Sequence, residues 1–305
     1  MDHPVRSNTY KSLRARVVQF ISESYNIATQ SNIVFVCGGN DVDHMRKRFL
    51  LEFPKLLPNH TFFEPEYAMQ SYYSMDDPVP FDIAKFEELV GELSHSIVLF
   101  PEAPGSFAET GYFSAIEKLV SKTLLVIDSR RQKTDSFISI GPAVHFDKLS
   151  KFGTRIHMDY SSPDFSLISS RLNERRGLNK IKRQFKIKKF RETSEFELFS
   201  LVQELVYTLR AATLEDLEYF LKSLYNGHIQ PTRIRQIVSI LVGSKRLSVV
   251  GQFGHLVVSR GAVRPLELRD RRITAQQVLA LDIGRALSEG GEEFRELLME
   301  VTDAD

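Results

Sequence analysis

The chain has 305 residues, 42% of them hydrophobic, a formal net charge of +1 and a single cysteine. This length and composition are typical of a globular protein with one large or two modest domains. The balanced charge excludes a uniformly basic or acidic surface, and one cysteine excludes an internal disulfide and a cysteine-rich zinc site. The chain has no membrane-length apolar run and no signal-peptide pattern, so we expect a cytoplasmic protein without a membrane partner.

Strand-like and helix-like segments alternate along the first half of the chain. Apolar spacing predicts a first helix over residues 9–24. Strands are then predicted at 33–37, 61–64, 96–100, 123–127 and 143–146, and helices at 41–51, 82–93 and 106–119. The strands are short, continuous and rich in β-branched residues, which is typical of a parallel sheet covered on both faces. The predicted fold class is therefore α/β, with a Rossmann-like, doubly wound parallel sheet.

A basic segment follows this alternating region. Residues 171–191 are dense in arginine and lysine, with Ile181, Phe185 and Ile187 between them. Such a cluster can neutralise nucleic-acid phosphates, although most charge runs are solvated helix surfaces. The residues predicted to contact nucleic acid in this segment are Arg175, Arg176, Lys180, Lys182, Arg183, Lys186, Lys188 and Lys189.

The carboxyl-terminal part has the pattern of a winged helix-turn-helix. Helices are predicted at 194–209, 214–224 and 230–241, an alternating strand pair at 247–250 and 255–258, and a last helix at 275–287. Arg233 and Arg235 lie near the start of the third of these helices, where a recognition helix meets bases or phosphates. Some winged helices bind only protein, so either partner is open. The predicted domains are 1–150, the basic or helical segment 151–195, and the winged helix 196–305.

Two predicted strand ends carry the candidate ligand-binding residues. The carboxyl ends of parallel strands meet at one edge of a sheet, where doubly wound folds bind ligands. Small residues there let the backbone approach a phosphate or a sugar. The residues predicted to contact a substrate in these two turns are Cys37, Gly38, Gly39, Pro101, Glu102, Gly105 and Ser106.

Several of these residues also allow a purely structural interpretation. Glu109 follows Ser106 by three residues, the spacing of a capping box that has no catalytic meaning. Gly38 and Gly39 also fit a plain tight turn, and Cys37 fits a buried strand end better than a nucleophile. Glu64 ends the second predicted strand, a position that holds a ribose hydroxyl in doubly wound folds or belongs to a surface loop.

Three segments together, residues 34–39, 99–111 and 135–142, closely resemble the nucleoside deoxyribosyltransferase-like effector proteins of retron anti-phage systems. The resemblance covers residues 30–150 well and extends more weakly through the basic segment and the winged helix. It implies an N-glycosidase domain, a hydrolase of the deoxyribosyltransferase type, in which Glu109 is the catalytic carboxylate. Similar effectors carry a glutamate aligned with Glu87, which otherwise fits a solvated helix face.

The resemblance implies a toxin that cleaves the N-glycosidic bond of NAD, of nucleotides or of nucleobases in nucleic acid. A carboxylate below the sugar stabilises or attacks the oxocarbenium-like centre that this reaction forms. The implied partners are a reverse transcriptase and its msDNA, an RNA-linked DNA, which restrain the toxin. Whether the effector also forms a homo-oligomer is left open. No cofactor is implied, and the sequence shows no metal site. The alternatives are a non-catalytic nucleotide sensor and a ligand-responsive winged-helix DNA-binding regulator.

Overall fold

The computed structural model describes residues 2–27, 31–63, 82–131, 135–174, 183–250, 256–259 and 264–290. These residues divide into two compact units, one formed by 31–63 and 82–174 (the sheet unit), the other by 2–27 and the described residues of 183–290 (the helical unit). The division differs from the expected boundaries in two places. The amino-terminal residues belong with the carboxyl-terminal part of the chain, and residues 151–174 belong with the sheet.

A five-stranded sheet forms the centre of the sheet unit, and every neighbouring pair of strands in it is parallel. In spatial order the strands are β3 (Thr61–Phe63), β2 (Ile33–Cys37), β4 (Ser96–Leu99), β5 (Thr123–Asp128) and β6 (Ile156–Met158). The α/β class with a parallel sheet is thereby confirmed. Because β3 lies on one side of β2 and β4 on the other, the direction of winding reverses at β2, which is the switch point of a doubly wound fold.

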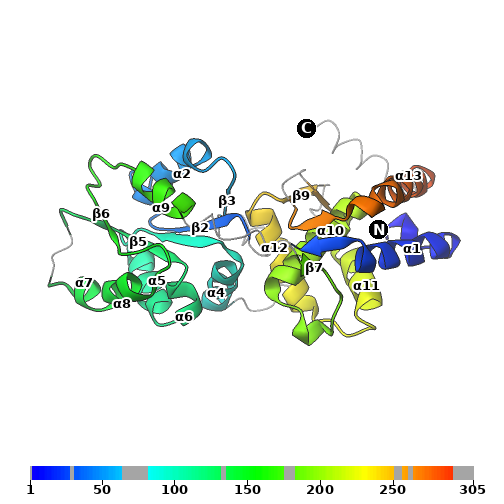
Figure 1. Ribbon diagram of the computed structural model, residues 1–305, viewed down its shortest axis with the longest axis horizontal. Helices are drawn as coiled ribbons and strands as arrows, with labels where there is room; N and C mark the ends of the chain where they lie inside the picture. Colours follow the sequence, from blue (N-terminus) through cyan, green and yellow to red (C-terminus); the bar gives the residue numbers. More distant parts are fainter. Residues whose placement is uncertain are drawn as a thin grey trace. The chain divides into compact units, whose positions relative to one another are not determined.

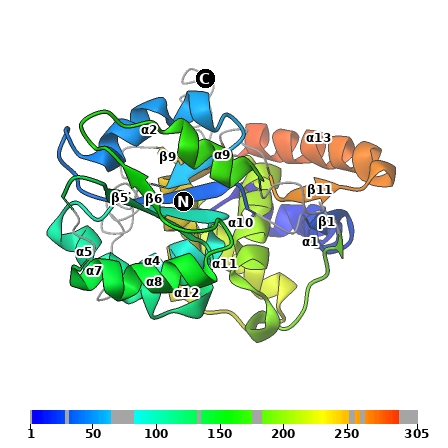
Figure 2. The ribbon, with the colours of Figure 1, turned by 60° about the vertical axis from the view of Figure 1, so that its left-hand side comes forward.

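Helices cover both faces of this sheet (Figures 1 and 2). One face carries α2 (Met45–Leu56) and α9 (Ser166–Glu174), whose apolar residues share a core with β2, β4 and β5. The other carries α4 (Ile83–Leu93), α5 (Pro104–Ser114), α6 (Glu117–Val120) and α8 (Pro142–Leu149), with the short α7 (Phe137–Ile140) beside them. On that face Phe35 packs against Phe63 and Phe113 at ring distances of 5.7 and 6.2 Å.

Three predicted elements of the sheet unit differ in the structure. Residues 143–146 are part of helix α8, not a strand, and the last strand is β6. Pro142 occupies the first helical position, where its missing N–H costs nothing, and Ala143 and Phe146 are buried on one side of that helix. The helix expected from residue 41 begins at Met45, and the helix expected over 106–119 is divided into α5 and α6.

The helical unit contains two antiparallel three-stranded sheets, in the orders β11-β1-β7 and β8-β10-β9. Its helices are α1 (Lys11–Glu23), α10 (Glu195–Leu209), α11 (Leu214–Leu224), α12 (Pro231–Gly243) and α13 (Ile273–Glu289). Its strands are β1 (Tyr25–Ile27), β7 (Arg183–Gln184), β8 (Ala211–Ala212), β9 (Leu247–Val250), β10 (Leu256–Ser259) and β11 (Leu266–Leu268). Short 3-10 helices are η1 (Pro4–Arg6), η2 (Asn8–Tyr10), η4 (Phe190–Glu192) and η5 (Asp270–Arg272).

Capping boxes begin two helices of this unit where the sequence predicts their starts. Ser194 and Glu197 cap α10, and Thr213 and Asp216 cap α11, each pair exchanging side-chain and backbone hydrogen bonds. The predicted helices at 194–209 and 214–224 and the predicted strand at 247–250 are confirmed within a residue. The basic segment, where it is described, contains a short strand and a 3-10 helix instead of an α-helix.

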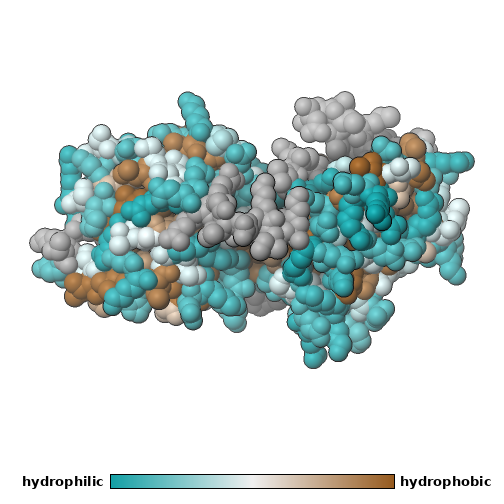
Figure 3. Space-filling model, in the orientation of Figure 1, coloured by the Kyte–Doolittle hydropathy of each residue, from teal (hydrophilic) through white to brown (hydrophobic). Residues whose placement is uncertain are grey.

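Exposed apolar side chains gather on α7. Phe137 and Ile140 are 78% and 63% exposed, and the brown area where α7 lies in Figure 3 shows this surface. Within the described part of the chain, no helix combines the length and the apolar character needed to cross a membrane.

Candidate active site

The carboxyl end of β2 carries a buried thiol that contacts one carboxylate and feels the charge of a second. Cys37, its last residue, is 3% exposed, and its thiol is hydrogen-bonded to the Glu109 carboxylate of α5. Burial raises the pKa of this thiol well above its ordinary value, and the charges of Glu109 and of Glu87 on α4 raise it further, whereas Arg46 opposes them. The thiol is therefore protonated at neutral pH and donates its hydrogen to Glu109. Two of the predicted site residues, Cys37 and Glu109, are thus in contact, and Glu87 is near enough for its charge to act on the thiol.

Glu109 does not cap a helix. Helix α5 begins at Pro104, so Glu109 lies in its second turn, and Ser106 is the third helical residue instead of the N-cap. The Ser106 hydroxyl accepts hydrogen bonds from the backbone N–H groups of Glu102 and Ala103, both at 3.0 Å, and is itself buried. The alternative interpretation of Glu109 as the partner of a Ser106 cap is therefore wrong. Its carboxylate contacts Cys37 instead.

Glu102 holds the turn that follows β2. Its carboxylate accepts hydrogen bonds from the backbone N–H groups of Gly39 at 3.0 Å, Met45 at 2.6 Å and Arg46 at 3.1 Å. A carboxylate at the amino terminus of α2 also interacts favourably with the helix dipole. A Cβ on Gly38 would lie 2.7 Å from the Arg46 Cβ and from Glu102 Oε1, so the glycine permits this close packing. The first amides of α2 are consequently occupied by a side chain of the protein.

The amino-terminal turn of α5 is open by comparison. Pro104 and Gly105 are exposed, and a Cβ on Gly105 would meet no atom within 4 Å. The N-cap residue, Ala103, offers no side-chain acceptor to the first amides. Pro101, two residues after the end of β4, is buried. Among the residues that the structure describes, the start of α5 therefore leaves its backbone approachable to a phosphate or sugar, whereas the start of α2 does not.

Arg46 is a site residue that the sequence analysis missed. It is 4% exposed, and its charge acts on the Cys37 thiol. A usable signal is its position on α2, three residues before the buried Phe49 and next to the buried Met45, which puts a cation at the edge of an apolar helix face. Glu64, also predicted to bind substrate, lies outside the described residues.

Comparison with known proteins identifies the family. A family model described as STM3845 retron effector protein matches residues 43–249, more than half of the chain. The chain belongs to this retron effector family. It is also similar to an Escherichia coli protein named retron Ec86 putative ribosyltransferase/DNA-binding protein, with 32% identity over 110 residues. That match covers 36% of this chain and 35% of the relative, so the chain spans about a third of the length of the relative it matches.

In this retron effector, several cations predicted to bind nucleic acid form internal ion pairs. Arg183 and Lys188 contact the buried Glu197 at 2.8 and 3.0 Å. Arg233, at the start of α12, contacts Glu195 at 2.7 Å and is only 17% exposed. These three side chains help to hold the helical unit together, because each neutralises a carboxylate on α10.

The remaining predicted nucleic-acid contacts of the retron effector differ in exposure. Lys186 and Lys189 are exposed and Arg235 is half-buried, and their role stays a prediction. Four more predicted contacts lie outside the described residues: Arg175, Arg176, Lys180 and Lys182.

Proposed function

We propose that this retron effector is a toxin that hydrolyses the N-glycosidic bond of a nucleotide-like substrate, with Glu109 as the catalytic carboxylate. The observation that carries the proposal is the Glu109 carboxylate, hydrogen-bonded to the buried Cys37 at the carboxyl end of β2. This end of the sheet, at the switch point, is where doubly wound folds bind ligands. The name of the Escherichia coli relative, a putative ribosyltransferase, supports chemistry at a ribose.

The reaction needs a carboxylate at the anomeric carbon. A Glu109 oxygen attacks C1′ while the C1′–N bond breaks, and the bonding electrons leave with the base. The nicotinamide of NAD leaves as a neutral molecule, whereas a purine or pyrimidine base takes a proton from water. A second water then attacks C1′, loses a proton to solvent, and returns the ester oxygen to Glu109 as a carboxylate. In the variant without a covalent intermediate, the same carboxylate stabilises the oxocarbenium ion by its charge while water attacks.

The residues around Glu109 have distinct roles in this proposal. The protonated thiol of Cys37 fixes the orientation of the carboxylate, since a buried hydrogen bond restricts its rotation. We assign Glu87 the role of accepting a hydrogen bond from a ribose hydroxyl. The exposed backbone of Gly105 is assigned to a phosphate oxygen, while Glu102 maintains the turn after β2.

The helical unit supports a winged-helix domain. Its chain order is α10, β8, α11, α12, β9, β10, and the three strands form the antiparallel sheet β8-β10-β9, an order of three helices and three strands that supports this proposal. We propose that this domain holds the effector in a complex with the retron reverse transcriptase and its msDNA. The DNA-binding part of the relative's name supports a nucleic-acid partner.

The test is release of free base by the purified chain from a panel of NAD, nucleotides and DNA, with and without the retron partners, followed by mass spectrometry. Glu109→Gln removes the nucleophile with little change in shape. Glu88→Gln is the matched control, because Glu88 lies next to Glu87 on α4 but contacts Tyr112. We expect base from the wild type and from Glu88→Gln, and a loss of at least about a thousandfold in Glu109→Gln.

Other outcomes distinguish the alternatives. Tight binding of a nucleotide without any released base would support a nucleotide sensor. Sequence-specific duplex binding without base release would support a DNA-binding regulator.

A further inference from the structure

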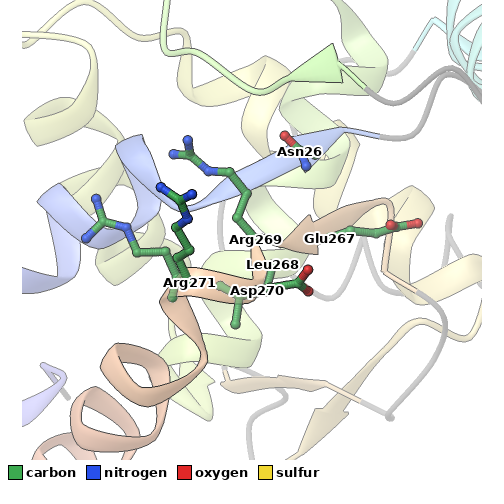
Figure 4. A pocket seen from close by; sticks show the side chains of 7 residues that line it. Asn26, Glu267, Leu268, Arg269, Asp270 and Arg271 are labelled. Carbon is green, nitrogen blue, oxygen red and sulfur yellow. The ribbon is translucent and has the colours of Figure 1, made fainter.

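Two adjoining cavities in the helical unit share a group of arginines. The first, of about 830 Å³, is lined by Asn26 of β1 and by residues 267–272 (Figure 4). The second, of about 510 Å³, is also lined by Arg271 and Arg272, and adds apolar side chains that include Phe20 and Leu279. The first cavity, lined by three arginines and two acidic residues, thus continues into one with an aromatic and aliphatic wall.

The arginines of the first cavity are mostly not neutralised. Within the described part of the chain, Arg269 and Arg271 have no ion pair, whereas Arg272 contacts Glu23 at 3.2 Å. The Nε of Arg269 is buried and has no hydrogen-bond partner. A buried donor without an acceptor costs free energy, so the internal contacts of Arg269 leave part of its hydrogen-bonding capacity unused.

The geometry around the cavity favours an anion. In Figure 4 the guanidinium groups of Arg269 and Arg271 extend to one side, and the carboxylates of Glu267 and Asp270 point the other way. The 17-residue helix α13 begins directly after Arg272, and no side chain caps it. Its positive end adds to the field of the arginines.

We propose that this cavity binds nucleotide phosphate groups through Arg269, Arg271 and Arg272, with the base against Phe20 and Leu279 in the adjoining cavity. Arginine is the side chain best suited to phosphate, since its planar donors match two oxygens at once. The cations that the sequence predicted for this task, such as Arg183 and Arg233, are ion-paired internally. The site lies in the helical unit and does not depend on the chemistry of Glu109.

The test is binding of three probes to the full chain by calorimetry: inorganic pyrophosphate, ADP and a short single-stranded DNA. It uses the Glu109→Gln background, so that no probe is cleaved. Arg269→Gln/Arg271→Gln removes two charges from the cavity. The matched control, Lys11→Gln/Arg191→Gln, removes two charges from exposed positions of the helical unit that line neither cavity.

We expect the cavity variant to lose at least about tenfold in affinity, because each charge-assisted hydrogen bond contributes that much, and the control to stay within about twofold. For DNA, the slope of log affinity against log salt concentration is expected to become about 1.4 less steep in the cavity variant, because two phosphate contacts are lost, and to stay unchanged in the control. Loss for ADP alone assigns a free nucleotide, and loss for DNA assigns a nucleic-acid backbone. Equal losses in both double variants, unchanged binding in the cavity variant, or a parent protein that binds none of the probes would overturn the proposal.

Discussion

At the scale of single residues, burial makes the Cys37 thiol unreactive. Thiol reagents attack the thiolate, and both burial and the neighbouring carboxylates hold the pKa of Cys37 well above its usual value. We therefore expect the folded protein at neutral pH to resist a thiol-reactive disulfide reagent that labels it completely in urea. Rapid stoichiometric labelling of the folded protein would contradict the role of Cys37 as a hydrogen-bond donor to Glu109.

Glu102 makes a second prediction at this scale. Its carboxylate satisfies three backbone N–H groups at the turn and at the start of α2. We expect Glu102→Ala to lower the free energy of unfolding of the sheet unit by about 2 to 4 kcal/mol, and Glu102→Gln, which keeps one oxygen, to lower it less. Urea denaturation with Glu117→Gln as the exposed control measures this. An unchanged stability in Glu102→Ala would show that water replaces the carboxylate.

Glu102 also shows why the sequence could suggest a site residue but not its contacts. Its place in the turn after β4 marks it as close to a ligand, and the sequence analysis selected it on that ground. The backbone N–H groups that donate hydrogen bonds to it belong to residues 39–46, about 60 positions earlier. Only the folded sheet brings these segments together. Local patterns can therefore select the correct edge of the sheet without distinguishing a ligand contact from a structural clamp.

At the scale of elements, alanine substitutions at two glycines that follow neighbouring strands are expected to have different effects on stability. A Cβ at Gly38 would collide with Arg46 and Glu102, whereas a Cβ at Gly105 would meet open space. We expect Gly38→Ala to lower the melting temperature of the sheet unit and Gly105→Ala to leave it unchanged or slightly higher. In the proposed enzyme, Gly105→Ala is expected to raise KM, since the methyl group occupies the approach to α5. A large loss of stability in Gly105→Ala would contradict the open helix start.

The elements that the sequence predicted well are those with strong local signals. Continuous β-branched runs gave β2, β4 and β5, and capping residues gave the starts of α10 and α11. Residues 143–146 were assigned to a strand because a short apolar run has no clear period, although Pro142 was a usable helix-start signal. The true last strand, β6, is three residues long with an exposed histidine at its centre, which is too weak a pattern to identify.

At the scale of the whole molecule, the chain builds its helical unit from distant segments. Strand β1, near the amino terminus, pairs with β11 and β7, and α1 packs with α13. The composition of the sequence changes near residue 150, which suggested a domain boundary there. However, α9 at 166–174 completes the core of the sheet unit. Long-range strand pairing leaves no local mark on the sequence, so the expected domain limits missed both features.

The cluster that joins these distant segments makes a pH prediction. Glu204 on α10 is fully buried, accepts two hydrogen bonds from Arg264 and one from Tyr25, and burial raises its pKa to about 7. A carboxyl whose pKa is higher in the folded state than in the unfolded state stabilises the fold below the unfolded value, and this contribution is lost as the pH rises toward 7. We expect the free energy of unfolding of the wild type to fall, relative to that of Glu204→Gln, by up to about 3 kcal/mol as the pH rises from about 4.5 to 7.

Urea titrations of both proteins across that range give the difference directly. His3, whose pKa burial lowers, affects the two proteins equally and cancels. Parallel stability curves would show that Arg264 keeps Glu204 ionised throughout, against the prediction.

The most direct test of the central claim is base release in ¹⁸O-labelled water by wild type and Glu109→Gln, each alone and with the retron partners. The proposed hydrolysis predicts free base from the wild type, with one labelled oxygen on C1′ of the released sugar, and no base from Glu109→Gln. Equal base release by the two proteins would remove Glu109 from the reaction. Absence of base in every preparation would contradict an N-glycosidase.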